Sequence, residues 1–385
     1  MNPQMEAEQA VLGAILLAPE RLRDVAGWLR PEHFYRPAHA ALFEVLLAQD
    51  AAGHPDPPPD TDGASSAWAT QAMASAAEAS PGFTPGYGHT LIAACPVTGH
   101  AAAYGRMVLE TAVRRQVHEH AHRLLAAART GAVDGTLHLT GALRAAIGQL
   151  AEAWGSLDES PRALPGPWPL ELPPADVEEA LRQEASLLAS LTALPREVRD
   201  ISRWLHPADF LDRGHRAVYR AVAALAHHGD PIDPLTVLWE VQHHGDLASG
   251  ATTADAVRAV TRAGFSGDPG YWAEQVLQAS VLRSALTAAG TVRMLSLDAS
   301  LPAARLLGSA LRTLRGTEAV QKRWRTATGA AGTGGNPVGE PGEPEHRRYA
   351  ARARSLAPVP DTGTSGPASP AQQAACARAP IRSSH

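Results

Sequence analysis

The chain of 385 residues is 45% hydrophobic and 19% charged, with a formal net charge of −5. This length suits two domains with additional segments better than a single domain. No run approaches the roughly 18 to 20 uncharged apolar residues of a membrane span, and residues 1–8 are acidic where a signal peptide is basic. We therefore expect a cytoplasmic protein with no membrane contact.

The cysteines and the lysine exclude several kinds of functional site. Cys95 and Cys376 lie too far apart in the sequence for a disulfide framework or a cysteine zinc site. Lys322 is the single lysine, and the glycines and hydroxyl residue of a phosphate-binding P-loop do not surround it. We therefore expect no nucleotide-hydrolysing motor in these residues, no catalytic residues and no cofactor.

Apolar residues at helical spacing predict helices through the first part of the chain. Two such stripes run over residues 7–17 and 41–46, and signals typical of strands are sparse. Residues 53–63 are rich in proline and aspartate and cannot continue a helix. A long helix is predicted over residues 104–128, with Val113, Val117 and Leu124 on one apolar face.

The chain contains an internal repeat. Residues 19–34 align without gaps on residues 195–210, at a constant offset of 176. The identical pairs include Trp28/Trp204, Leu29/Leu205, Pro31/Pro207, Phe34/Phe210 and His39/His215. A second register of 168 pairs Arg115 with Arg283, so a helix predicted over residues 272–295 is the counterpart of the helix over 104–128. The sequence therefore predicts two copies of one helical unit.

Composition indicates where the two copies begin and end. Residues 156–174 contain six prolines and are predicted to form an extended linker between a first domain at 1–155 and a second at 175–326. Residues 327–385 carry Gly, Pro, Ala, Ser and Arg without periodic apolar residues, which predicts a disordered basic tail. The predicted fold class is all-α, with two helical bundles in tandem.

The motifs of both copies resemble a known family. Glu6-Ala-Glu-Gln-Ala-Val-Leu-Gly-Ala-Ile-Leu16, followed by Leu29-x-Pro-x-x-Phe-Tyr-x-x-x-His39, resembles the N-terminal domain of the DnaB-type replicative DNA helicases. In the second copy, Pro207-Ala-Asp-Phe210, His215-Arg-Ala-Val-Tyr219 and Gly229-Asp-Pro-Ile-Asp-Pro-Leu-Thr-Val237 resemble the central block of that family. The resemblance covers residues 5–155 and 175–325.

The sequence also departs from that family. The first copy has the Pro/Asp-rich loop in place of a Gly-x-Pro-Ile-Asp block, and the second has Glu178-Glu-Ala-Leu-Arg-Gln-Glu-Ala185 in place of the Glu-x-Ala-Val-Leu-Gly opening. No RecA-like motor domain is recognised. In these helicases the N-terminal domain builds a collar of paired domains and contacts primase and loaders. The resemblance therefore implies a non-catalytic, replication-associated protein that binds a replicative helicase, primase or itself.

The shared residues have structural interpretations. The paired Trp and Phe residues flank a proline turn and are predicted to fill the space between helices. His39 and His215 lie at the start of the following helix, where a histidine more often packs or satisfies the backbone than catalyses. Asp233, directly before Pro234, is predicted to cap the helix that follows.

One motif suggests a metal site. His118-Glu-His-Ala-His122 matches H-E-x-x-H, in which two histidines bind zinc and the glutamate activates water. Helical geometry predicts that His118 and His122 lie on the solvated face, whereas a catalytic zinc needs a sheltered cleft. The second copy has neither histidine. A metal-dependent hydrolase acting through His118, Glu119 and His122 is therefore the unfavoured alternative, and we predict no metal site.

Charge is unevenly distributed along the chain. Residues 312–385 hold eleven basic and five acidic residues, a net of +6, which leaves −11 for residues 1–311. We therefore expect the folded body to repel DNA and the tail to hold it. Lys322-Arg323-Trp324-Arg325 interleaves cations with an aromatic ring, a pattern that suits phosphate contact and base stacking. A DNA-tethering scaffold is thus the second alternative, although cations at a helix end also suit the helix dipole alone.

Overall fold

The computed structural model describes residues 3–53, 64–80, 82–158 and 171–329. All regular elements in this part of the chain are helices, which confirms the all-α class. The first half contains α1 (Pro3–Leu17), α2 (Pro37–Ala51), α3 (Ala64–Ala79), α4 (Pro85–Ala93), α5 (Ala101–Arg129) and α6 (Val133–Trp154). The second half contains α7 (Pro174–Ala193), α8 (Val198–Ile201), α9 (Arg213–His228), α10 (Pro234–His243), α11 (Ala254–Arg262), α12 (Pro269–Leu297) and α13 (Ala303–Ala327).

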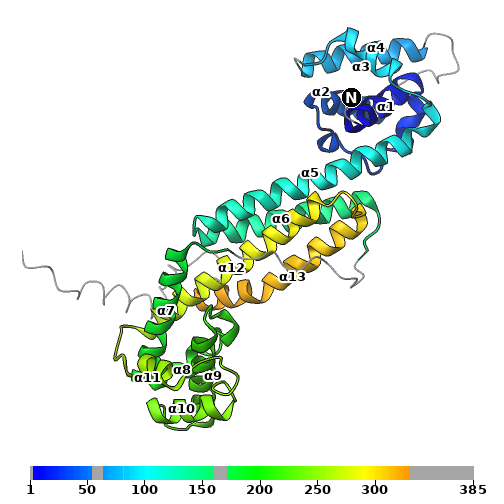
Figure 1. Cartoon of the computed structure of the whole chain (residues 1–385). Coiled ribbons are helices and arrows are strands. Elements are labelled where there is room, and N and C mark those ends of the chain that lie inside the picture. Colours follow the sequence, from blue (N-terminus) through cyan, green and yellow to red (C-terminus); the bar gives the residue numbers. More distant parts are fainter. Residues whose placement is uncertain (1–2, 54–63, 81, 159–170, 330–385) are drawn as a thin grey trace, which may run out of the picture.

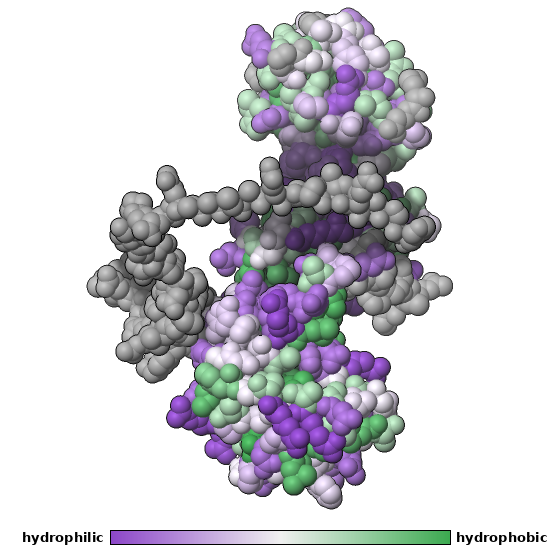
Figure 2. Space-filling model, turned by 60° about the vertical axis from the view of Figure 1, so that its left-hand side comes forward, coloured by the Kyte–Doolittle hydropathy of each residue, from purple (hydrophilic) through white to green (hydrophobic). Residues whose placement is uncertain are grey.

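Two globular heads stand at opposite ends of a central bundle (Figure 1). The first head consists of α1–α4, the second head of α7–α11, and the central bundle of the hairpins α5–α6 and α12–α13. Figure 2 shows the heads as separate lobes, with hydrophilic residues on the bundle where it leaves the first head. Helices α5 and α12 have 29 residues each, so each spans about 43 Å at 1.5 Å per residue. Each therefore reaches from its own head towards the other one.

Local sequence signals explain where several helices begin and end. Asp233 accepts hydrogen bonds from the backbone N–H groups of Leu235 and Thr236, and Pro234 occupies the first turn of α10. This confirms the predicted cap. Gly155 and Gly229 follow α6 and α9 with φ of 83°, a left-handed conformation that favours glycine at a helix C-terminus.

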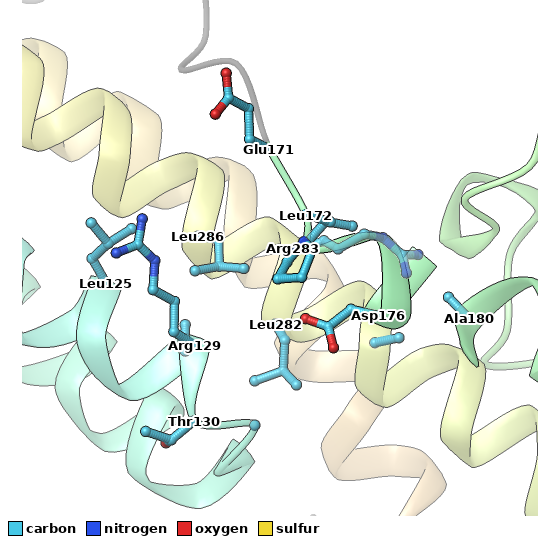
Figure 3. Close-up of a pocket in the computed structure, with 14 residues that line it drawn as sticks. Leu125, Arg129, Thr130, Glu171, Leu172, Asp176, Ala180, Leu282, Arg283 and Leu286 are labelled. Carbon is cyan, nitrogen blue, oxygen red and sulfur yellow. The ribbon is translucent and has the colours of Figure 1, made fainter. Parts of the chain in front are cut away.

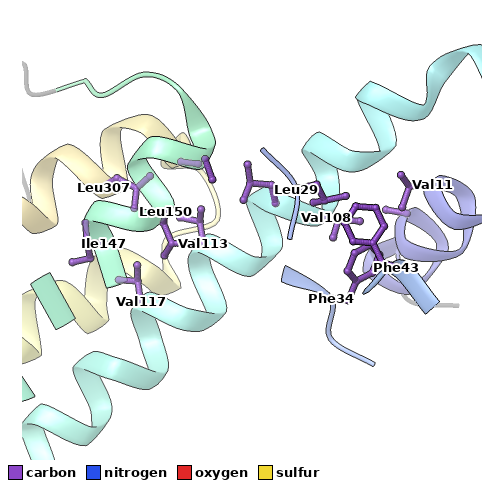
Figure 4. Close-up of a cluster of buried hydrophobic side chains, with 14 of the residues drawn as sticks. Val11, Leu29, Phe34, Phe43, Val108, Val113, Val117, Ile147, Leu150 and Leu307 are labelled. Atoms are coloured by element: carbon purple, nitrogen blue, oxygen red, sulfur yellow. The ribbon is translucent and has the colours of Figure 1, made fainter. Parts of the chain in front are cut away.

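One hydrophobic core runs from the first head into the bundle. Val11, Phe34 and Phe43 fill the head, and Val113 and Val117 continue the same cluster along α5 (Figure 4). The cluster also takes in buried residues of the other three bundle helices, namely Leu143, Ile147, Leu150, Ala289, Val292, Leu306, Leu307, Ala310 and Leu314. Burying one such aliphatic side chain contributes about 1.5–3 kcal/mol. The hairpin α12–α13 of the second copy thus contributes to the same hydrophobic core as the first copy.

The second core shows the reciprocal arrangement. It is built on α7–α11 and the start of α12, and it includes Val133 at the start of α6, with Leu137 packed against it. At the same place the end of α13 contributes Val320 and Ala327. Each hairpin therefore contributes to the core at the far end of the bundle as well as to its own.

The repeated aromatic residues differ in burial. Phe34 and Phe210 are buried as predicted, whereas Trp28 and Trp204 are only half-buried. The guanidinium of Arg106 lies over the Trp28 ring, 4.4 Å from its centroid, and covers its outer face.

Residues 159–170 of the predicted linker and 330–385 of the predicted tail lie outside the described residues. None of the described helices combines the length and the hydropathy that crossing a bilayer requires.

Candidate interaction site

A buried glutamate in the first head fixes the turn before α2. The carboxylate of Glu8, on α1, accepts hydrogen bonds from the backbone N–H groups of Tyr35 at 2.6 Å and Arg36 at 3.4 Å. Its Oε2 also lies 2.7 Å from Nδ1 of His39, and both side chains are fully buried. The other ring nitrogen of His39 lies 2.9 Å from the Tyr87 hydroxyl on α4. One carboxylate therefore ties three elements of the head together.

The second head repeats this arrangement at the constant offset of 176. Glu184, on α7, accepts hydrogen bonds from the backbone N–H groups of Leu211 and Asp212. Its Oε2 lies 3.0 Å from Nδ1 of His215. A buried carboxylate is costly unless its oxygens are hydrogen-bonded, and here several donors satisfy it. Both histidines therefore orient a buried carboxylate at the start of a helix, in keeping with their predicted structural role.

An arginine from the bundle holds each head against its hairpin. Arg115 on α5 donates hydrogen bonds to the carbonyls of His33 at 3.2 Å and Phe34 at 3.4 Å. Arg283 on α12 donates to the carbonyl of Asp209, the counterpart of His33. Burial lowers the pKa of the His33 imidazole to about 4, and the neutral ring accepts a hydrogen bond from the backbone N–H of Arg30.

Polar contacts between the two hairpins supplement their shared core. Arg114 on α5 donates to the carbonyls of Asp298 and Leu301, where α12 turns into α13. Arg144 on α6 forms an ion pair with Glu318 on α13 at 2.8 Å. The guanidinium of Arg114 thus ties the turn between α12 and α13 to α5. The bundle is therefore an interface between the copies, held by apolar burial and by side chains from both.

Comparison with known proteins identifies this repeated unit. The family model described as the DnaB-like helicase N terminal domain matches residues 1–60 and 176–277. Two segments of the chain, one in each copy of the repeat, are thus similar to the DnaB-like helicase N-terminal domain. The matched segments comprise α1 and α2 of the first head, nearly all of the second head and the start of α12, so the resemblance of both copies to this family is confirmed.

Relatives match only parts of the chain. The replicative DNA helicase DnaB of Mycobacterium leprae is 32% identical over 135 residues, which cover 33% of this chain and 20% of the relative. DnaB of Leifsonia xyli is 30% identical over 118 residues, 31% of this chain and 24% of the relative. DnaB of Geobacillus stearothermophilus is 47% identical over 51 residues, which cover 13% of this chain and 11% of the relative. The matches thus span at most about a quarter of the length of each relative.

The structure separates the four residues predicted to contact nucleic acid. Lys322 and Arg325 are exposed near the end of α13. Arg323 forms an ion pair with the buried carboxylate of Asp209, and Trp324 packs against the second core. Two of the four side chains therefore hold α13 against the second head. The nucleic-acid role of Lys322, Arg323, Trp324 and Arg325 stays a prediction.

The H-E-x-x-H motif lies on α5 beside α12. His122 is exposed as predicted, but the expectation for His118 is wrong, because its Nδ1 lies 3.2 Å from the Ser296 hydroxyl and the ring is half-buried. Helical periodicity within one sequence segment does not reveal a helix that packs from elsewhere. Among the described residues, no group of three or more His, Cys, Asp or Glu side chains is placed to hold a metal ion.

Sequence reasoning missed the buried glutamates. It placed the acidic start of α7 at residues 178–179 and concluded that the second copy lacks the opening of the first. The exact Glu-x-Ala-Val-Leu-Gly motif is absent from the second copy, but its place is residues 184–189 and not 178–185, because the offset of 176 carries Glu8 onto Glu184 and residues 11–12 onto the buried Leu187 and Leu188. Extending the repeat register towards the N-terminus would have found the pair.

A cavity of about 900 Å³ marks the junction between bundle and second head (Figure 3). Leu125 of α5 and Leu282 and Leu286 of α12 line its apolar part, while Arg129 and Asp176 supply charged groups. Because it lies between α5 of the first copy and α7 and α12 of the second, its shape depends on how the two copies pack.

Proposed function

We propose that this protein is a non-catalytic, replication-associated adaptor that presents two paired DnaB-type N-terminal domains to a replicative helicase or to primase. The observation that supports this is the shared core of the α5–α6 and α12–α13 hairpins, which joins both copies within one chain. In this proposal the copies occupy residues 1–155 and 175–326, residues 156–174 link them, and residues 327–385 form a basic tail.

The arrangement of the heads supports a role in binding. The hairpins bury their apolar faces against each other, so the heads remain the free surfaces at both ends of the molecule. The second head exposes Leu235 and Trp239 one turn apart on α10, with 73% and 69% of their surface accessible. Exposed large apolar residues of this kind are enriched at protein interfaces.

Size-exclusion chromatography with light scattering tests this function directly. The full chain of 40.4 kDa is run alone, with the full-length replicative helicase of the same cell, and with its primase. We expect a complex of defined mass ratio with one of these partners, and no ATP hydrolysis by the chain alone. Separate elution from both at micromolar concentrations contradicts the adaptor function. The mass of the chain alone reports whether it forms a homo-oligomer.

A DNA-tethering scaffold is the second candidate, and the net charge of +6 over residues 312–385 favours it. Replacing Arg347, Arg348, Arg352 and Arg354 together by alanine leaves every described residue intact. If the tail tethers DNA, this variant loses most of a salt-dependent DNA affinity, because fewer phosphates are neutralised. Equal affinity of the variant and the unmodified chain contradicts tethering by the tail.

A further inference from the structure

A groove runs between α12, α13 and the turn at Pro207–Asp209 of the second head. Its volume is about 730 Å³, and three arginines line it, namely Arg216 of α9, Arg283 of α12 and Arg323 of α13. Ser284 and Thr287 of α12 also line it, and their hydroxyl groups make no hydrogen bond to the described residues. The groove thus combines cationic donors with free hydroxyl donors.

The three guanidinium groups converge on the turn at residues 207–210. Arg323 pairs with the carboxylate of Asp209, Arg283 donates to the backbone carbonyl of the same residue, and Arg216 donates to the carbonyl of Phe210 at 3.0 Å. Each guanidinium has five N–H groups, so Arg216 and Arg283 retain donors beyond these bonds. The carboxylates of Asp209 and Glu184 lie near these three cations, which leaves a net of one positive charge at the groove.

Comparison of the copies shows that this concentration of arginine is not required by the fold. At the offset of 176, Ala40 takes the place of Arg216, and His33 takes the place of Asp209. In the first copy Arg115 binds the carbonyls of His33 and Phe34, and the side-chain amide of Gln116 donates to the carbonyl of Glu32. The same turn therefore forms without a second guanidinium, and Arg216 is additional to what the turn needs.

Charge is segregated within the folded body. The bundle, residues 101–154 and 269–327, holds fourteen basic and seven acidic residues, a net of +7. The described residues 3–53, 64–80 and 82–100 carry a net of −4 and residues 171–268 a net of −6. The expectation that the whole folded body repels DNA thus applies to the heads, whereas the bundle attracts anions.

We propose that the groove between α12 and α13 binds the phosphate groups of single-stranded DNA. Arginine and hydroxyl side chains are the usual donors to backbone phosphates. A groove of about 730 Å³ is too small to hold a duplex and admits part of one strand. An anion placed between Arg216 and Arg283 also relieves their mutual repulsion. The groove binds DNA whether or not the protein docks on a helicase.

Fluorescence anisotropy with a labelled oligothymidylate tests the groove in the full chain. Arg216→Ala removes one phosphate donor and is compatible with the turn, because the first copy has Ala40 at that place. Arg213→Ala is the matched control, since Arg213 lies on the same helix, is exposed, carries the same charge and does not line the groove. We expect Arg216→Ala to weaken binding about tenfold and to reduce the salt slope by about 0.7, and Arg213→Ala to change affinity less than twofold.

Three outcomes overturn the proposal. The first is an equal loss in both variants, which indicates general charge attraction. The second is unchanged affinity in Arg216→Ala, which places the DNA elsewhere on the chain. In the third, inorganic pyrophosphate binds in an Arg216-dependent way and the oligothymidylate does not, so the groove takes free phosphates. Circular dichroism spectra of both variants that match the unmodified chain establish that any loss concerns binding and not folding.

Discussion

Leu307 offers the sharpest test of the core that the two copies share. It lies on α13 of the second copy, is fully buried, and packs in the core of the first. Leu307→Ala removes three carbon atoms, which at about 0.8 kcal/mol each lowers the free energy of unfolding by about 2.4 kcal/mol. The cavity left behind raises this loss to about 3–4 kcal/mol. The whole chain, and not only the second copy, should lose this stability.

Urea unfolding followed by tryptophan fluorescence and circular dichroism measures the loss, and hydrogen exchange locates it. We expect one transition by both probes and faster exchange in α5 of the first copy. Leu297→Ala is the matched control, because Leu297 is 59% exposed and its truncation should cost less than about 0.5 kcal/mol. Two separate transitions, with α5 exchange unchanged in Leu307→Ala, would refute the shared core.

Two further predictions concern single side chains. The pKa of His33 is lowered by burial to about 4 from 6.5, so the stability that its neutral form contributes is complete above pH 6.5 and is lost as the pH falls towards 4, by up to about 3 kcal/mol. His33→Asn should flatten that part of a stability–pH profile from urea unfolding, and an unchanged slope would contradict the assignment. A Cβ on Gly13 would lie 2.1 Å from the carbonyl oxygen of Leu91, whereas one on Gly148 meets open space. Thermal unfolding should therefore show Gly13→Ala destabilised by about 1–3 kcal/mol and Gly148→Ala stabilised by about 0.5–1 kcal/mol, and equal shifts would be inconsistent with the close approach of α1 and α4.

Much of the local structure could be predicted from the sequence. The helices expected over 104–128 and 272–295 are present as α5 and α12, each slightly longer than predicted. The cap at Asp233 follows from an aspartate directly before a proline, and the repeat follows from residues at constant spacing. Each of these signals depends on neighbours in the chain or on one fixed offset.

Contacts between residues far apart in the sequence could not be predicted in this way. The pairing of Asp209 with Arg323 joins residues 114 positions apart, and no local pattern indicates which carboxylate a distant arginine will find. His118 was expected to face solvent because only its own helix was considered. Apolar stripes on α5 and α13 indicate that each helix buries a face, but not that these faces meet each other in one bundle.

Because both copies lie in one chain, their sequences do not have to be identical, as those of the subunits in a homodimer must be. A dimer of identical subunits uses the same surface twice, so any substitution appears on both sides of the symmetry axis. In this chain the two copies are encoded separately, and they already differ, with Ala40 and His33 in the first copy at the positions that Arg216 and Asp209 hold in the second. Pairing within one chain also does not depend on protein concentration. The two copies therefore pack against each other as two subunits would, although their sequences differ. Each copy is free to acquire its own ligand.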